Sequence, residues 1–205
     1  MKVTREKAAA HRAAIVTAAS RLFRRHGFDG VGVAEIMKAA GLTHGGFYGH
    51  FASKEALAAE ACGDAFAHGM TRLQPGHAVG DGDILGYLDS YLSELHRDHP
   101  EQGCPMAAFA EEITRQSMPV QREFTAGTAQ FIDALAQHLA PGAGEDAAQR
   151  RRRAIAVLAT MVGGMALARA TAGTSPELSA EILASVRAQL PELRETAPRQ
   201  SAGLP

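Results

Sequence analysis

The sequence contains no tryptophan and only two cysteines, and aromatic residues make up 5% of its 205 residues. The cysteines, Cys62 and Cys104, are far apart and fit no metal-binding or oxidoreductase spacing, so we expect no disulfide framework. No run of about 18 apolar residues is present, and Met1 is followed by a polar, charged stretch. We therefore expect neither membrane insertion nor secretion, and we place the protein in the cytoplasm with no membrane partner.

The motifs of common enzyme classes are missing as well. The sequence has no phosphate-binding glycine loop after a strand, no nucleophile elbow and no His-Glu-x-x-His zinc motif. The alternation of apolar and polar residues that is typical of strands is also missing. We therefore expect neither an enzyme nor a bound cofactor. What is present, 46% hydrophobic and 21% charged residues, is the composition of a soluble globular protein.

Charge is distributed unevenly along the chain, although the formal net charge is only -1. Residues 1–60 hold nine Lys and Arg against five Asp and Glu, whereas residues 61–205 hold twelve against seventeen. The chain therefore has a short basic part followed by a long acidic part.

Apolar residues recur at helical spacing through most of the chain. One helix is predicted along the stripe from Ile15 to Phe23, ending at Gly27, and a second from about Val33 to Ala40, closed by Gly41. A third begins after Thr43 and reaches about His50, and a fourth starts at Lys54, capped by Ser53, and runs to about Leu73. Later helices are predicted on the stripes Ile84 to Leu95, Met106 to Ile113 and Val120 to Leu139, and over Asp146 to Thr171 and Ser175 to Leu190.

These elements predict an all-α fold in two parts. Residues 1–55 are expected to form an N-terminal three-helix domain with a helix-turn-helix that binds DNA, and residues 56–190 a helical bundle. A loop is expected over Gln74 to Gly82, where proline and glycine cluster. The polar, proline-punctuated residues 191–205 are expected to be a disordered tail.

The predicted third helix has a composition that an ordinary packing helix would not have. It reads His44-Gly45-Gly46-Phe47-Tyr48-Gly49-His50-Phe51, and each of its three glycines costs about 1 kcal/mol relative to alanine in a helix interior. A helix seated in the major groove of DNA gains from glycine, because its backbone can approach bases and phosphates closely. The pattern therefore predicts a helix that reads double-stranded DNA.

The residues around the glycines suit the same role. Thr43 and the free N–H groups of the first turn are expected to hold a phosphate. Tyr48, His50 and Lys54 are expected to reach the DNA backbone, and His44 is expected to touch a base edge. Phe47 and Phe51, one helical turn apart, are expected to face inward.

The segment from Gly27-Phe28 through Leu57, including Gly41-Leu42-Thr43-His44-Gly45-Gly46-Phe47-Tyr48-Gly49-His50-Phe51-Ala52-Ser53-Lys54-Glu55, resembles the TetR family of bacterial repressors. The resemblance covers residues 10–60, and the later helices match that family only in number, length and order. It implies a homodimer on a palindromic operator, released when a small-molecule effector binds a C-terminal ligand-binding and dimerisation domain. The residues that match the family's DNA-contacting positions are Thr43, His44, Gly45, Gly46, Tyr48, His50 and Lys54.

One position departs from the family pattern. Where the family has Ser or Thr at the cap of the second helix, this chain has Gly32, which offers no hydroxyl to a phosphate. We expect a weaker contact there, compensated by the basic residues Lys2, Arg5, Lys7 and Arg12.

The last two helices are the expected dimer interface. Gly163-Gly164 lets two helices come close, and the apolar stripes beside it suit a four-helix interface across a two-fold axis. The expected interface residues are Leu158, Met161, Val162, Gly163, Met165, Ile182, Leu183 and Val186.

Large, soft or aromatic residues of the C-terminal part are candidates for lining an effector pocket, and they would equally fill an ordinary core. The candidates are Phe66, Met70, Leu88, Tyr91, Leu92, Cys104, Met106, Phe109, Phe124, Phe131 and Met165.

Cys104 directly precedes Pro105 at the expected start of a helix, where the macrodipole favours the thiolate. His96, Arg97 and His99 are expected to add positive charge, so Cys104 is a candidate sensor of electrophiles or oxidants. Gly103-Cys104-Pro105-Met106 is also similar to the cysteine region of electrophile-responsive family members. Two alternatives stay open: a cysteine of no regulatory use, and a metal-responsive regulator with His96, His99 and Cys104 as ligands. Cys62, on an apolar helix face, is expected to be a core residue.

Overall fold

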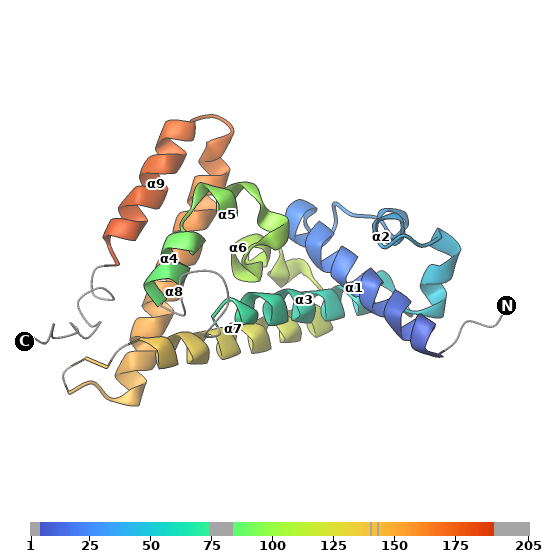
Figure 1. The fold of residues 1–205 in the computed structure, drawn as a ribbon, viewed down its shortest axis with the longest axis horizontal. Helices are drawn as coiled ribbons and strands as arrows, with labels where there is room; N and C mark the ends of the chain where they lie inside the picture. Colours follow the sequence, from blue (N-terminus) through green and yellow to red (C-terminus); the bar gives the residue numbers. More distant parts are fainter. Residues whose placement is uncertain (1–4, 74–83, 140, 143, 191–205) are drawn as a thin grey trace, which may run out of the picture. The chain divides into compact units, whose positions relative to one another are not determined.

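The computed structural model describes residues 5–73, 84–139, 141–142 and 144–190. The predicted loop over Gln74 to Gly82 and the predicted tail over residues 191–205 lie outside the described residues. Every regular element among the described residues is a helix (Figure 1), which confirms the all-α prediction. The chain divides into two compact units, the first made of residues 1–71 and 95–129 and the second of residues 72–94 and 130–205.

The first unit begins with the predicted set of helices. These are α1 (Arg5–His26), α2 (Val33–Ala39), the 3-10 helix η1 (His44–Gly49) and α3 (Lys54–Thr71). The ends of α1 and α2 and the start of α3 agree with the sequence prediction, but α1 begins at Arg5, well before the predicted stripe from Ile15. The third helix is of the tighter 3-10 type. Each contributes a side chain with no exposed surface to one small core: Ile15 and Phe23 from α1, Ile36 from α2, Phe47 from η1 and Leu57 from α3.

Two glycines with positive φ end α1 and α2. Gly27 has φ 77° and Gly41 has φ 72°, a region that favours glycine. After α2, the N–H of Leu42 donates to the carbonyl of Met37 at 2.9 Å and the N–H of Gly41 to that of Lys38 at 3.0 Å. This pair of bonds is a Schellman motif, and it sets the direction in which the chain enters η1.

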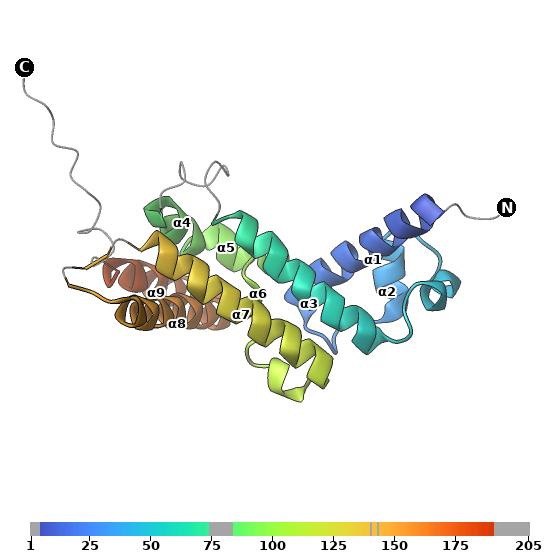
Figure 2. The ribbon, with the colours of Figure 1, turned by 90° about the horizontal axis from the view of Figure 1, so that it is seen from below.

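The rest of the first unit is a series of short elements that ends on a long helix. They are α5 (Glu94–Asp98), η2 (Pro100–Gln102), α6 (Pro105–Phe109), η3 (Ile113–Arg115) and the first part of α7 (Met118–His138). Helices α3 and α7 lie side by side (Figure 2). They meet at Gly127, where a Cβ atom would lie only 2.2 Å from Cγ of Phe66.

Two predicted helices are shorter than their apolar stripes suggested. The stripe from Ile84 to Leu95 is divided between α4 (Ile84–Tyr91) and α5, and Leu95 is 71% exposed instead of buried. At the break, the Ser93 hydroxyl donates to the carbonyl of Ser90 at 2.6 Å, a local bond that competes with the helix. The helix that opens at Pro105 likewise ends at Phe109, which leaves Ala110 exposed.

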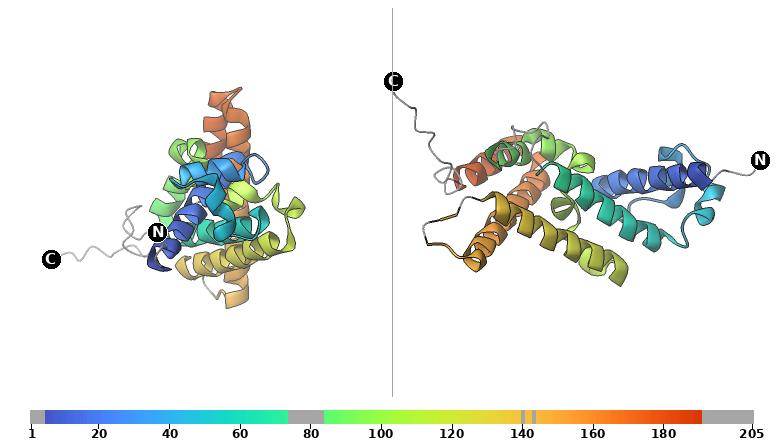
Figure 3. Two further views of the ribbon diagram at one scale, coloured as in Figure 1. Left: turned by 90° about the vertical axis from the view of Figure 1, so that its right-hand side faces the viewer. Right: turned by 60° about the horizontal axis from the view of Figure 1, so that its bottom comes forward.

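The second unit is built on two long helices, α8 (Ala147–Ala172) and α9 (Pro176–Ala188), which lie side by side (Figure 3). Ser175, where the last helix was predicted to begin, accepts from the N–H of Leu178 and caps α9, and Asp146 caps α8 through the N–H of Gln149 at 2.7 Å. The two helices come close at Gly164, where a Cβ atom would lie 2.7 Å from Cγ2 of Val186.

Helix α8 contains an 18-residue window with a mean hydropathy of 1.6, which is enough to cross a membrane by length and composition alone. The absence of an unbroken run of about 18 apolar residues in the sequence therefore does not by itself exclude a helix of this length and composition. Core helices of soluble proteins pass the same test, and Met161 and Met165 of α8 are fully buried in the second unit. Only 39% of the window is buried, so α8 leaves apolar surface that the chain itself does not cover.

The close approach of α3 and α7 gives a stability prediction. Replacing Gly127 with Ala inserts a methyl group against the buried ring of Phe66. Such overpacking costs about 1–3 kcal/mol, more than the gain in helix propensity of up to about 1 kcal/mol. We expect a lower free energy of unfolding, measured by urea denaturation.

Gly63→Ala is the matched control. A Cβ atom at Gly63 would meet only the end of the flexible Glu123 side chain, at 3.2 Å, so this variant should be as stable as the wild type or slightly more stable. Equal stability of the two variants would show that α3 and α7 are not in close contact at Gly127.

Candidate nucleic-acid interface and the Cys104 segment

Helix η1 presents one face to solvent and anchors the other in the core. Thr43, His44, Gly45, Gly46 and Tyr48 are exposed, and Tyr48 keeps 74% of its surface. On the opposite side, Phe47 and Phe51 are buried with their ring centroids 5.8 Å apart, as the sequence predicted. The exposed face therefore consists of small or polar groups, on a helix whose opposite side is anchored in the core.

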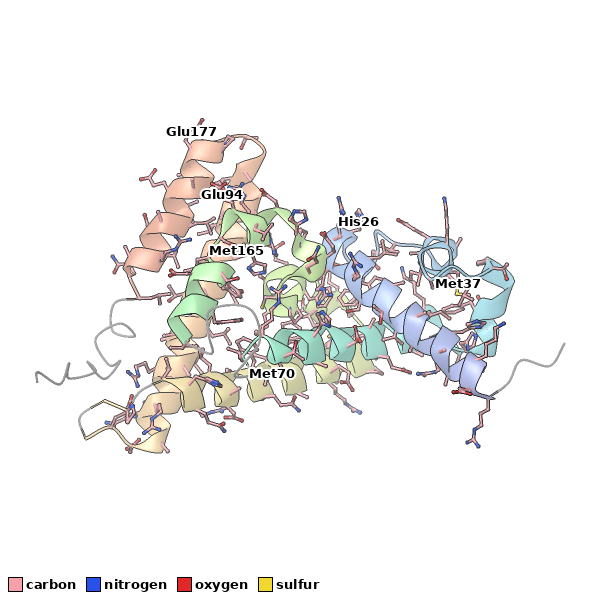
Figure 4. The ribbon with its side chains drawn as sticks, viewed as in Figure 1. His26, Met37, Met70, Glu94, Met165 and Glu177 are labelled. Carbon is pink, nitrogen blue, oxygen red and sulfur yellow. The ribbon has the colours of Figure 1, made fainter. Side chains whose placement is uncertain are left out.

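In the part of the chain that the structure describes, no neighbouring atom requires the glycines of η1. A Cβ atom at Gly45 or Gly49 would meet nothing within 4 Å, and one at Gly46 would make an ordinary contact of 3.6 Å with Cε of Met37. Met37 is labelled on α2 in Figure 4. None of the three has a positive φ. Their conformational cost is therefore not offset by packing inside the chain.

The basic residues that flank η1 differ in their availability. His50 is half-buried, with its ring 6.2 Å from that of His11, and Lys54 is half-buried with Nζ 5.9 Å from the Phe23 centroid. Arg12 lies over the Phe51 ring at 4.5 Å and donates to Glu60 at 2.6 Å. The expected use of Arg12 as a phosphate contact is therefore in competition with an internal ion pair.

The caps of α2 and η1 leave donors open on this surface. Gly32 caps α2 with extended backbone and no side-chain bond, and Thr43 caps η1 without using its hydroxyl. In contrast, Ser53 accepts from the N–H of Ala56 at 3.2 Å and closes the start of α3. The first-turn N–H groups of α2 and η1 thus have no side-chain cap.

Cys104 is buried, and its backbone N–H donates to Nε2 of His96 at 2.9 Å. That nitrogen must be unprotonated to accept, so His96 does not supply the positive charge that the sequence suggested. Arg97 donates to Asp98 at 2.7 Å, and Nδ1 of His99 lies 3.2 Å from Oε1 of Glu101. Arg97 and His99, which were expected to add positive charge near the thiol, are thus each paired with a carboxylate.

The cationic group that does reach this segment comes from α1 and was missed from the sequence. Arg24 is buried and donates to the carbonyl of Gly103 at 3.5 Å, and Nη1 of Arg25 lies 4.0 Å from Oε2 of Glu101. Burial opposes the charge of Glu101, but its own backbone N–H, His99 and Arg25 outweigh that effect and lower its pKa. The only signal in the sequence was the Arg24-Arg25 pair near the end of a helix.

The metal alternative has no support in the part of the chain that the structure describes. No group of three or more His, Cys, Asp and Glu side chains there is arranged to hold a metal ion. His96 already accepts a hydrogen bond from Cys104, and His99 pairs with Glu101. The alternative of a metal-responsive regulator with His96, His99 and Cys104 as ligands therefore gains no support from the geometry of the described residues.

Cys62 is a core residue, as expected. It is fully buried on α3, and burial, with a smaller contribution from Glu123, raises the pKa of its thiol to about 12. At neutral pH the thiol is protonated and therefore a poor nucleophile.

The candidate pocket residues are divided between the units. Phe66 and Phe124 of the first unit pack edge to face at 5.6 Å, and Phe109 packs on Phe28 at 4.6 Å. In the second unit, Tyr87 links Tyr91 and Phe131 at 6.0 and 6.3 Å. Apart from the half-buried Met70 and Phe124, all candidates are buried: Phe66, Cys104, Met106 and Phe109 in the first unit, and Leu88, Tyr91, Leu92, Phe131 and Met165 in the second.

The predicted interface residues of α8 and α9 have different surroundings. Those that the chain itself already buries are Leu158, Met161, Met165 and Leu183. Those that keep exposed surface are Val162, Gly163, Ile182 and Val186. Larger apolar surface is exposed on Ile155, Leu167 and Leu178, at 44%, 59% and 44%. The exposed apolar face is therefore offset from the predicted one.

Two family models match this chain. Residues 15–61 match the model of bacterial regulatory proteins of the tetR family, and residues 83–181 match the C-terminal domain of LmrA/YxaF-like transcriptional regulators. The first range contains η1 and the residues around it, and the second contains Cys104, α7 and α8.

Curated relatives and solved structures agree with these models. The HTH-type transcriptional repressor NemR of Escherichia coli K12 is 27% identical over 132 residues, which are 62% of this chain and 66% of NemR. DhaR of Mycobacterium sp. strain GP1, also an HTH-type transcriptional repressor, is 26% identical over 109 residues, 53% of this chain and 55% of DhaR. The chain thus spans just under two thirds of the length of NemR and about half of that of DhaR.

Among solved structures, the reduced form of E. coli NemR matches with a TM-score of 0.72 and 22% identity, over 92% of this chain and 98% of that one. A TetR regulator from Chloroflexus aurantiacus J-10-fl matches with a TM-score of 0.68 and 27% identity, over 90% and 94%.

Proposed function

Because the chain belongs to the TetR family of bacterial regulatory proteins, we propose that it is a sequence-specific DNA-binding transcriptional repressor. In this proposal it acts as a homodimer in the cytoplasm, on a palindromic operator, and is released by a small-molecule effector or by modification of Cys104. The observation that carries the proposal is the exposed, glycine-rich face of η1, whose glycines are not required by the packing of the described residues.

The glycines support close approach to a duplex. A Cβ atom at Gly45 or Gly49 would meet no described atom of the chain within 4 Å, and an external partner that approaches this backbone closely would explain the glycines. In the major groove, a glycine backbone comes closer to base edges and phosphates than any other residue allows. His44 and Tyr48 project from the same face, which suits a base contact and a backbone contact.

Charge at the start of α3 supports the same partner. Lys54 is the first residue of α3, at the positive end of the helix dipole, where a cation destabilises a helix. A DNA phosphate would offset that cost and would also bind the open first-turn N–H groups of η1. Thr43, whose hydroxyl is not used as a cap, would bond to the same phosphate.

The DNA-binding proposal is tested with an operator selected from random DNA. Gly45→Ala should keep or raise the stability of the fold and weaken operator binding at least tenfold, because its methyl group meets nothing in the chain. Tyr48→Ala should weaken binding on every sequence, Lys54→Ala should lower the salt slope by about 1, and His44→Ala should change the preferred bases. Affinities are measured by fluorescence anisotropy at several salt concentrations.

Met118→Ala is the control, because Met118 is a large, 59% exposed residue of the first unit outside η1 and its flanks. It should bind operator like the wild type. If the four η1 and α3 variants also kept wild-type affinity and selectivity, DNA would have to bind elsewhere.

We also infer that the exposed apolar face of α8 and α9 is the dimer surface. Ile155, Leu167 and Leu178 are large hydrophobic residues that remain 44%, 59% and 44% exposed in the single chain, and Val162 and Gly163 lie between Ile155 and Leu167 along α8. A second copy related by a two-fold axis would cover this face in a four-helix interface. The already buried Leu158, Met161, Met165 and Leu183 would then support the interface from behind.

Leu167→Glu tests the dimer surface. Because Leu167 is 59% exposed in the single chain, the change should leave the fold intact and shift the protein to monomer in sedimentation velocity. Leu95→Glu, at a residue that is 71% exposed in the first unit, should remain dimeric. A dimeric Leu167→Glu variant would exclude this face as the interface.

Release by thiol modification is proposed for Cys104 and not for Cys62. The structure of E. coli NemR is that of its reduced form, which describes a redox state of that protein. In this chain, Cys104 keeps some exposed surface, whereas Cys62 has none. Cys62 remains protonated at neutral pH because its pKa is about 12. A small electrophile should therefore form its adduct at Cys104.

N-ethylmaleimide at pH 7.5 is expected to release operator DNA from the wild type and not from Cys104→Ser. Intact-mass spectrometry and peptide mapping should find one adduct, at Cys104, and none at Cys62 in the folded protein. Equal release from the wild type and from Cys104→Ser would assign the response to another group.

A further inference from the structure

The exit of α1 is held by a carboxylate from a distant part of the first unit. After Gly27, the N–H of Phe28 donates to Oε2 of Glu112 at 2.9 Å. A carboxylate is electrostatically unfavourable at the C-terminal end of a helix, where the dipole is negative. The contact therefore does not serve to stabilise α1 as a helix, and its effect is to tie residues 27–28 to the segment that carries Glu112.

The Glu112 carboxylate lies so close to the α-carbon of Gly27 that a side chain at this position would collide with it. A Cβ atom at Gly27 would lie 2.4 Å from Oε1 and 2.8 Å from Oε2 of Glu112, and the φ of 77° already favours glycine. Glu112 thus lies directly on the α-carbon of Gly27. His26, labelled in Figure 4, marks this end of α1.

Three further contacts join the same end of α1 to the segment of residues 101–112. Arg24 donates to the carbonyl of Gly103, Arg25 pairs with Glu101, and the Phe28 ring packs on Phe109 at 4.6 Å. Cys104 lies between these attachment points, next to Gly103. A chemical change at Cys104 would therefore act on a segment that contacts the end of α1 through residues before and after the cysteine.

Helix α1 extends this connection to the exposed face of η1. It contacts both α2 and α3, and α2 contacts η1. Phe23, one turn before Gly27, is fully buried in the same core as Phe47, which anchors η1. A displacement at the end of α1 thus changes the packing that orients η1.

We propose that Glu112 is the positioning residue that transmits the state of the Cys104 segment to the DNA-reading surface, through its hydrogen bond to Phe28. This inference rests on the proposed function, and it assigns the regulation of that function to one bond. Loss of the bond should leave operator binding intact and abolish its response to a change at Cys104. Glu112 touches neither DNA nor the thiol in this assignment.

A double-mutant cycle on the whole chain of 205 residues tests the coupling. Cys104→Asp places a permanent acid in the segment without any reagent, and it should weaken operator binding at least tenfold when Glu112 is present. In the Glu112→Ala background, the same change should weaken binding less than threefold. Glu112→Gln keeps an oxygen that can accept from Phe28, so it should restore the response of the wild type, which loss of stability alone would not explain.

Hydrogen exchange of the Phe28 amide provides a second measurement that needs no DNA. The amide should be protected in the wild type and in Glu112→Gln, and it should exchange at least tenfold faster in Glu112→Ala. N-ethylmaleimide treatment or Cys104→Asp should speed exchange over residues 24–28 when Glu112 is present, and should add nothing in Glu112→Ala. Melting temperatures identify any variant that has simply unfolded, and the alkylated wild type replaces Cys104→Asp if that variant does not fold.

The outcomes separate the coupling from the function on which it rests. If Glu112→Ala responds to Cys104→Asp as strongly as the wild type, or if exchange over residues 24–28 ignores the change, the coupling is wrong. If exchange responds as expected and no variant, the wild type included, binds any DNA, the coupling stands and the proposed function is wrong.

Discussion

The interaction on which the candidate interface depends is the burial of Phe47 and Phe51 behind η1. A six-residue 3-10 helix with three glycines cannot be stable by itself, because nucleation is costly and glycine adds further backbone entropy. The two buried rings anchor it in the core of the first unit, α2 packs against it, and the Schellman motif at Gly41 fixes the direction of its approach. The packing of the first unit therefore does not determine which residues lie on the outer face of η1, and these residues can be suited to a partner.

The two units leave open surfaces of opposite character. In the first unit, the exposed face of η1 combines glycine backbone with His44 and Tyr48, and its flanking cations are partly restrained by Phe23, Phe51 and Glu60. In the second, α8 and α9 expose aliphatic side chains such as Leu167. A polar surface on which glycines expose the backbone suits a charged duplex, whereas an aliphatic surface suits a second copy of the chain.

The sequence was sufficient where structure is decided locally. Helix starts and ends at Gly27, Gly41, Ser53, Asp146 and Ser175 follow from capping chemistry, and the inward placement of Phe47 and Phe51 follows from helical spacing. It failed where long-range contacts decide. Three hydrogen bonds join residues at sequence separations that no helical repeat predicts: Phe28 to Glu112, Arg24 to Gly103 and Cys104 to His96. Leu95 is exposed because the helix that its apolar stripe predicted is broken near Ser93.

The burial of Cys62 has a consequence for how an oxidised chain would recover. With only two cysteines in the sequence and one of them protonated in the core, a sulfenic acid at Cys104 has no internal thiol with which to form a disulfide. The first step of recovery would then be attack by an external thiol, which forms a mixed disulfide and releases water, and a second external thiol would free the Cys104 thiol. The duration of the signal would then be set by the reducing capacity of the cell rather than by the protein.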